Sequence, residues 1–163
     1  MDARARKTIK KASLRQEKQT ALDIGGRTTA NSGAARFSGG ADVRAAGKLR
    51  VECKFTEKDF YVLKLKELEK LKKQAVKALE FPVFQFAFKF RNTLTKYAVT
   101  KYDQATTPSL METLEWLGDG SVRIRHEELQ QALAKYKLLL VHLNGSAFKI
   151  QYWDDFVAGF RED

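Results

Sequence analysis

The chain has 163 residues, 44% hydrophobic and 31% charged, which fits a folded globular domain and excludes a fibrous or low-complexity chain. A single cysteine excludes an intramolecular disulfide, and no apolar run suits a membrane span or a signal peptide, so we expect an intracellular protein. The net charge of +10 points to a polyanionic partner, with nucleic acid as the first candidate.

The basic excess lies in the first part of the chain. Residues 1–101 carry 24 Lys and Arg against 10 Asp and Glu, whereas residues 102–163 carry 6 against 10. The basic N-terminus lacks an apolar period and predicts a flexible arm over residues 1–12, which either contacts DNA phosphates or is a solvated tail. Its candidate DNA-binding residues are Arg4, Arg6, Lys7, Lys10 and Lys11.

The first regular element is expected after this arm. A helix over about residues 14–23 can be capped by Ser13 and is ended by the glycines that follow it. Residues 26–41 are rich in Gly, Ser, Thr and Asn and predict a loop. Strands are expected at 42–45 and 49–55, because apolar and polar residues alternate in the second of them.

The middle of the chain holds the strongest patterns. A helix over about 64–79 carries leucines on one face and a lysine stripe on the other, which is either solvated or DNA-facing. Strands follow at 82–91 and near 95–100, and residues 59–63 fit a strand or the start of the helix. Phenylalanines at every second position of 82–91 indicate a packed sheet face rather than base stacking.

The last third continues the alternation of helices and strands. A short helix is expected from about 108 to 117, a strand at 121–125 and a helix at 126–136. An Asn-Gly turn predicts a hairpin over 138–152, and residues 153–160 close with a helical turn. The whole order predicts an α/β fold class, with a central mixed β-sheet flanked by helices.

Charged side chains gather around the strand at 49–55. Glu52 and Lys54 share one face of that strand, and a tight turn before it would bring Asp42 close to Glu52. Glu17 lies on the inward face of the first helix and is a third acidic candidate. Converging carboxylates suit Mg²⁺ or Mn²⁺. Each residue also has an ordinary interpretation, as part of a solvated strand face, a turn or a surface ion pair.

The loop after the first helix offers phosphate contacts. Its polar candidates are Arg27, Thr28, Asn31 and Ser32, although many surface loops have this composition. The two histidines and Cys53 make no zinc-binding spacing and read as structural residues. No Walker-type loop is present, so we expect no small-molecule cofactor.

In chain order, Glu17, Asn31-Ser32-Gly33, Asp42 and Glu52-Cys53-Lys54 resemble the motifs of the PD-(D/E)XK nuclease superfamily. The closest resemblance is to Holliday junction resolvases of the archaeal and phage type, although Ala41 stands where the superfamily name has proline.

This resemblance covers about residues 13–90 and implies a restriction-endonuclease-like fold. It implies one nuclease domain over residues 13–163, with a catalytic core in 13–100 and a C-terminal elaboration in 101–163.

The resemblance further implies a metal-dependent endodeoxyribonuclease that resolves four-way DNA junctions. Glu17, Asp42, Glu52 and the main-chain carbonyl of Cys53 would hold Mg²⁺, with Mn²⁺ as a substitute, and Lys54 would assist catalysis. The approximate two-fold symmetry of a junction implies a homodimer, acting inside a cell or in the bacterial host of a phage. The alternatives are a related nuclease for restriction, repair or phage DNA processing, and a DNA-binding module without catalysis.

Overall fold

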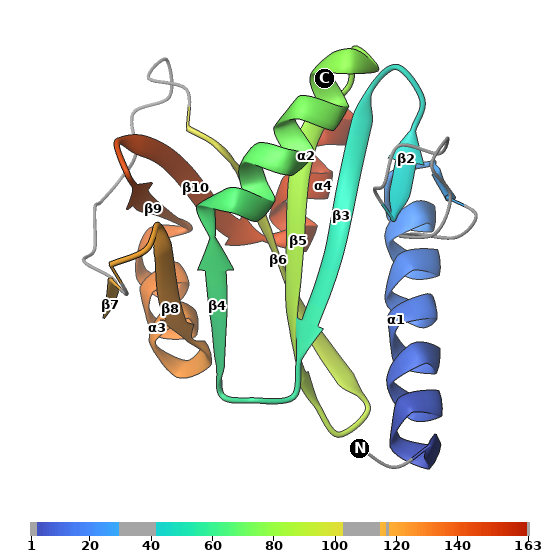
Figure 1. Ribbon diagram of the computed structural model, residues 1–163, viewed down its shortest axis with the longest axis horizontal. Helices are drawn as coiled ribbons and strands as arrows, with labels where there is room; N and C mark the ends of the chain where they lie inside the picture. The colour runs from blue at the N-terminus through green and yellow to red at the C-terminus, as the bar shows by residue number, and fades with distance from the viewer. Residues whose placement is uncertain (1–2, 30–41, 103–114, 117, 163) are drawn as a thin grey trace.

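The computed structural model describes residues 3–29, 42–102, 115–116 and 118–162 (Figure 1). The helices are α1 (Ala3–Asp23), α2 (Leu65–Lys77), α3 (His126–Tyr136) and α4 (Trp153–Glu162). The strands are β1 (Arg27–Thr28), β2 (Val43–Ala45), β3 (Leu49–Thr56), β4 (Phe60–Lys64), β5 (Phe81–Phe90), β6 (Thr93–Lys101), β7 (Glu115–Trp116), β8 (Ser121–Arg125), β9 (Leu138–Leu143) and β10 (Ser146–Tyr152). In this part of the chain, no helix is both long and apolar enough to cross a membrane.

Within the described residues, seven strands form one sheet in the order β1-β2-β3-β5-β6-β10-β9. The sheet is mixed, because β3 and β5 run parallel while the other neighbouring strands are antiparallel. The strands β4, β8 and β7 form a second, antiparallel sheet. The chain therefore has the expected α/β fold class, a mixed sheet flanked by helices.

Helix α1 begins at Ala3, although the sequence predicted a flexible arm over residues 1–12. The segment 3–13 contains several strong helix formers and neither Gly nor Pro, so the helix extends through it without needing an apolar face. Its side chains are largely exposed, whereas Gln16 and Glu17 are buried. In Figure 1 the exposed half of α1 reaches past the end of β3.

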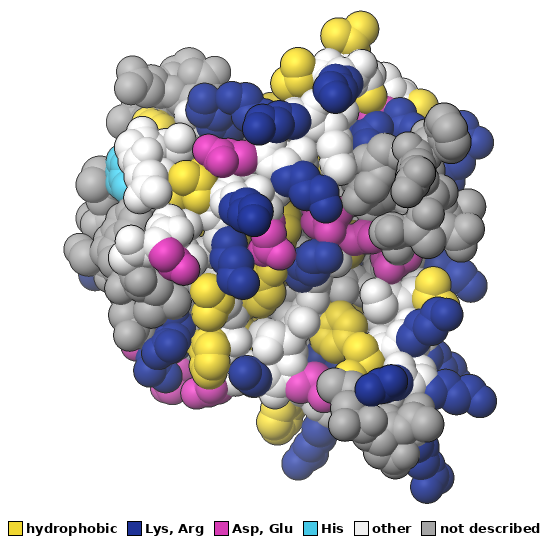
Figure 2. Space-filling model, viewed as in Figure 1, with side chains coloured by type: hydrophobic (Ala, Val, Ile, Leu, Met, Phe, Trp, Pro, Cys, Tyr) yellow, Lys and Arg dark blue, Asp and Glu magenta, His cyan; other side chains and the backbone are white. Residues whose placement is uncertain are grey.

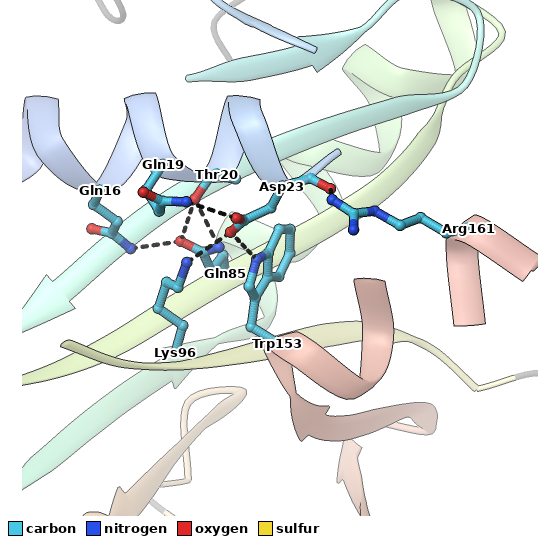
Figure 3. Close-up of polar contacts among 8 residues, drawn as sticks. All are labelled: Gln16, Gln19, Thr20, Asp23, Gln85, Lys96, Trp153 and Arg161. Atoms are coloured by element: carbon cyan, nitrogen blue, oxygen red, sulfur yellow. Dashed lines mark hydrogen bonds and ion pairs between the residues drawn. The ribbon is translucent and has the colours of Figure 1, made fainter. Parts of the chain in front are cut away.

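The other end of α1 is held by residues from late in the chain (Figure 3). The Asp23 carboxylate accepts hydrogen bonds from Lys96 Nζ at 2.8 Å and from Trp153 Nε1 at 2.7 Å. Arg161 of α4 donates to the main-chain oxygen of Asp23 at 2.7 Å. These bonds join α1 to β6 and α4 on one face of the sheet.

Two hydrophobic clusters cover the two faces of the larger sheet. On one face, the phenylalanines of β5 pack with side chains of α2, α3 and the smaller sheet, and Phe84, Phe86 and Phe88 are buried as expected. Phe90, expected in the same row, is 69% exposed because β5 ends there. On the opposite face, α1 and α4 pack against β2, β3 and β5.

Several other expectations can be compared with these elements. The segment 59–63, expected as a strand or as the start of a helix, forms most of strand β4, which begins at Phe60. Asn144-Gly145 turns between β9 and β10 with positive φ at both positions. The helix expected at 108–117 is wrong at its end, because β7 pairs there with β8, and 103–114 lies outside the described residues. The expected loop begins with β1, paired to β2, and its residues 30–41 also lie outside.

Candidate active site

The four residues that the sequence singled out for chemistry line one cavity. Glu17 from α1, Asp42 from the segment before β2, and Glu52 and Lys54 from β3 border a space of about 770 Å³. The exposed part of α1 contributes Ile9 to the same wall. The structure thus brings together side chains from three separate segments of the chain.

Asp42 is fixed by the backbone of the neighbouring strand. The Cys53 amide donates a hydrogen bond of 2.8 Å to Asp42 Oδ2, and the Asp42 amide donates to the Val51 carbonyl at 3.1 Å. Asp42 is only 7% exposed. The carboxylate therefore has a defined position beside β3, close to Glu52.

Glu52 and Lys54 form an ion pair, with 2.8 Å between Lys54 Nζ and Glu52 Oε1. Burial raises the pKa of Glu52 above its usual value, and the negative charge of Asp42 adds to the effect. Burial opposes the charge on Lys54, but the hydrogen bond and charge of Glu52 prevail and raise the pKa of Lys54. Lys54 is therefore a cation at neutral pH, suited to stabilise negative charge rather than to accept a proton.

Glu17 is buried in the wall that α1 contributes. Burial raises its pKa, although Ser13 Oγ donates to Glu17 Oε1 at 3.0 Å, and the charge of Asp42 raises the pKa further. Ser13, expected to cap a helix, instead lies inside α1 and contacts this carboxylate. Burial is the main cause of the raised pKa of both Glu17 and Glu52, and the negative charge of Asp42 adds to it. A bound cation would favour the charged form of both carboxylates.

A buried ion-pair cluster fixes the strands that carry these carboxylates. Glu80, between α2 and β5, accepts hydrogen bonds from Arg44 of β2 and from Arg50 of β3, the latter at 2.9 Å. Burial alone would raise the pKa of Glu80, but the bonds to Arg44 and Arg50 lower it below its usual value. Arg44 lies two residues after Asp42, and Arg50 lies two residues before Glu52. Because β2 and β3 are paired, the cluster fixes the backbone next to both carboxylates.

The donor set suits a hard divalent cation. The carboxylates of Glu17, Asp42 and Glu52 and the Cys53 carbonyl are oxygen ligands of the kind that Mg²⁺ and Mn²⁺ prefer. Among the residues that the structure describes, no three His, Cys, Asp or Glu side chains are already grouped to hold a metal ion. The residues fit the metal by chemistry, and binding would require Glu17 and Glu52 to close towards Asp42.

The candidate DNA-binding residues fall into two groups. The basic residues of the N-terminus lie on the exposed half of α1, which borders the cavity through Ile9. Arg27 and Thr28 are exposed in β1, but they are not among the residues that line the cavity. Asn31 and Ser32 lie outside the described residues. Arg4, Arg6, Lys7, Lys10 and Lys11 do not line the cavity either, but they belong to the same helix as Ile9, Ser13 and Glu17, which do.

Two further cations border the cavity and were missed as site residues. Lys58 follows β3, and Lys70 of α2 lowers the pKa of Glu52 by its charge. The sequence placed Lys70 in a stripe that was either solvated or DNA-facing, and its spacing gave no sign of the carboxylate opposite. Figure 2 shows Lys and Arg side chains over α1 and α2, with acidic side chains between them.

The fold and the cavity define an α/β domain that presents buried carboxylates beside basic helices. No protein-family model matches the chain, and no curated protein matches it in sequence. Among solved structures, it is similar to Hjc, a Holliday junction resolvase from the archaeal hyperthermophile Archaeoglobus fulgidus. The identity is 14%, the match covers 90% of this chain and 98% of that chain, and the TM-score is 0.49.

Proposed function

We propose that the protein is a metal-dependent endodeoxyribonuclease that cleaves branched DNA, with the four-way junction as its substrate. The observation that carries this proposal is the cavity that three carboxylates and the Lys54 ammonium line together, beside the basic half of α1. A module that only bound DNA would gain nothing from buried carboxylates, because they repel phosphates unless a cation is present. The arrangement therefore favours phosphodiester hydrolysis.

The roles of the residues follow from their positions. Glu17, Asp42, Glu52 and the Cys53 carbonyl would hold Mg²⁺, which supplies an activated water and charge neutralisation when bound. Lys54 stabilises the negative charge that develops on the phosphate, and Asp42 keeps its orientation through the Cys53 amide. Water attacks phosphorus and the bond to the 3′-oxygen breaks, which leaves a 5′-phosphate and a 3′-hydroxyl.

A homodimer is part of the proposal, because paired cuts in a two-fold symmetric junction need two sites. An exposed apolar patch at the end of α2 supports it: Val76 is 61%, Leu79 87% and Phe81 47% exposed. The patch adjoins a groove of about 230 Å³ between α2 and the sheet, lined in part by Pro82 and Phe148. Leu79 has a φ of 54°, a left-handed backbone conformation that is uncommon for leucine. Such patches are typical of protein contacts.

The test compares a labelled four-way junction with a linear duplex of the same arms, in Mg²⁺, in Mn²⁺ and in chelator. The native protein should cut the junction symmetrically and only with metal. Glu52→Gln and Asp42→Asn should bind the junction without cutting it, while Glu127→Gln on the distant helix α3 should behave as native.

Two other results of this cleavage test would contradict the proposed function. Equal cutting of the linear duplex would replace junction resolution with a general nuclease activity. Tight binding of both DNAs without cleavage under any metal condition would leave a DNA-binding module and refute the proposed chemistry.

A further inference from the structure

A buried polar network lies beneath the candidate active site, at the contact between α1 and the sheet (Figure 3). Gln16 Nε2 donates to Gln85 Oε1 at 2.8 Å and to the main-chain carbonyl of Lys54 at 3.0 Å. Thr20 Oγ1 donates to Gln85 Oε1 at 3.0 Å and accepts from Gln85 Nε2 at 2.9 Å. Two residues of one helix are thus joined to two strands by directional bonds.

The polar side chains of this network are almost completely buried. Gln16 is 2% exposed, and Thr20 and Gln85 are 0% exposed, in a region where Val83 and Ala87 flank Gln85 on the same strand face. Apolar side chains would fill this space without the cost of removing amides from water. Gln16 Oε1 even lacks a partner. The network therefore contributes a defined geometry rather than additional burial of apolar surface.

The residues of this network are direct neighbours of the candidate site residues. Gln16 precedes Glu17 on α1 and contacts the backbone of Lys54, while Gln85 lies opposite Cys53 in the parallel β3–β5 pair. The Cys53 amide in turn holds Asp42. The bonds of Asp23 hold the C-terminal end of α1, whereas this network holds the turn that carries Glu17. Without the network, that turn would be freer to shift on the sheet and to carry Glu17 away from the other carboxylates.

We propose that Gln16, Thr20 and Gln85 are positioning residues, whose network fixes α1 on the sheet and thereby sets the place from which Glu17 reaches towards Asp42 and Glu52. The role in metal binding rests on the proposed function, whereas the effect on site geometry does not. These residues touch neither the metal nor DNA. They act through the placement of α1, and their loss weakens a site whose own ligands are all intact.

Thr20 offers a matched pair of variants. Thr20→Val keeps the shape and removes the hydroxyl, whereas Thr20→Ser keeps the hydroxyl and removes a methyl group. Thr20→Val should weaken Mn²⁺ binding about tenfold, in the range seen when outer supporting contacts of metal sites are lost. Thr20→Ser should stay near the native affinity. Gln85→Met, which removes the central amide, should show the larger loss.

Amide hydrogen exchange at Cys53 gives a second measurement that needs no metal and no DNA. Because α1 packs against Cys53 in one hydrophobic cluster, its amide should exchange faster in Thr20→Val than in Thr20→Ser. Leu133→Ala, in the other cluster, controls for stability, since it lowers stability without touching α1. It should leave Mn²⁺ affinity unchanged.

The outcomes separate the two proposals. Equal Cys53 exchange and equal Mn²⁺ affinity in both Thr20 variants would overturn the positioning role. If Gln85→Met fails to fold, the Thr20 pair alone decides. Absence of Mn²⁺ binding by the native protein would overturn the proposed metal chemistry, whereas faster Cys53 exchange in Thr20→Val would still establish that the network sets the geometry.

Discussion

Lys54 Nζ lies 2.8 Å from Glu52 Oε1, so the cation and one candidate metal ligand neutralise each other inside the cavity. A divalent cation would compete with Lys54 for Glu52, and a phosphate would compete with Glu52 for Lys54. When both ligands bind, the ion pair between Glu52 and Lys54 is replaced by two others, one between Glu52 and the metal and one between Lys54 and the phosphate. Replacing Lys54 should therefore affect phosphate binding and metal binding differently.

Lys54→Met should slow cleavage strongly while metal binding is kept. Removal of the ammonium frees Glu52 for the cation but leaves the developing phosphate charge without its partner, which we expect to slow cleavage by about 100-fold or more. Mn²⁺ titration and single-turnover cleavage of a junction measure the two effects. Lys89→Met, which removes a different ion-paired lysine, is the control. A native rate in Lys54→Met would remove Lys54 from the mechanism.

Neutralising the exposed half of α1 should reduce the salt dependence of DNA binding. Replacing Lys7, Lys10 and Lys11 together by Gln should lower the slope of log K against log salt by up to about 3, or about 0.9 for each lost phosphate contact. Helix formation is preserved, because Gln is a good helix former. The matched control replaces Lys135, Lys137 and Lys149 and removes the same charge elsewhere. Identical slopes for the two triple variants would show that this half of α1 is only solvated.

Glu80→Gln should destabilise the protein by about 3 kcal/mol at neutral pH, because it removes the buried carboxylate that pairs with Arg44 and Arg50. The folded-state pKa of Glu80 is below its usual value of 4.5, so its contribution is present above pH 4.5 and is lost as the pH falls through the folded pKa. The native and variant proteins should therefore converge in stability at low pH. Chemical denaturation at pH 7 and below pH 4 measures this, and a constant difference would contradict it.

His126 should make the fold less stable in mild acid. Its ring stacks on Phe88 at 4.2 Å between centroids, its Nε2 is buried without a partner, and burial lowers its pKa below the usual 6.5. The unfolded chain therefore binds the proton more readily, and stability falls as the pH drops below 6.5. His126→Phe should remove this component from a pH series of thermal melts. An unchanged pH profile in the variant would assign the dependence to other groups.

Leu79→Glu should convert the proposed dimer into a monomer. The substitution places a charge in the exposed apolar patch at the end of α2, whereas Leu22→Glu changes an exposed leucine of α1 outside this patch, 73% exposed. Light scattering coupled to size exclusion measures the mass of each. The monomeric variant should nick junctions without paired cuts. A dimer that survives Leu79→Glu would place the contact elsewhere.

The sequence predicted those parts of the site that depend on local periodicity. Glu52 and Lys54 share a face because strands alternate, and a short turn sufficed to bring Asp42 near. The start of α1 was missed because helix formers without an apolar face read as an arm. The bond between Gln16 and Gln85 spans 69 residues and follows from the tertiary packing of α1 on β5, which no local pattern encodes.

The contact between Asp23 and Trp153 joins residues 130 positions apart. It forms only when α4 is in place, so the helix that carries Glu17 is supported by an element far away in the sequence. Contacts of such long sequence separation are slow to form, because a large loop must close first. The candidate site therefore gains one of its supports from the slow-forming class of contacts, although Asp42, Glu52 and Lys54 lie close together in the sequence.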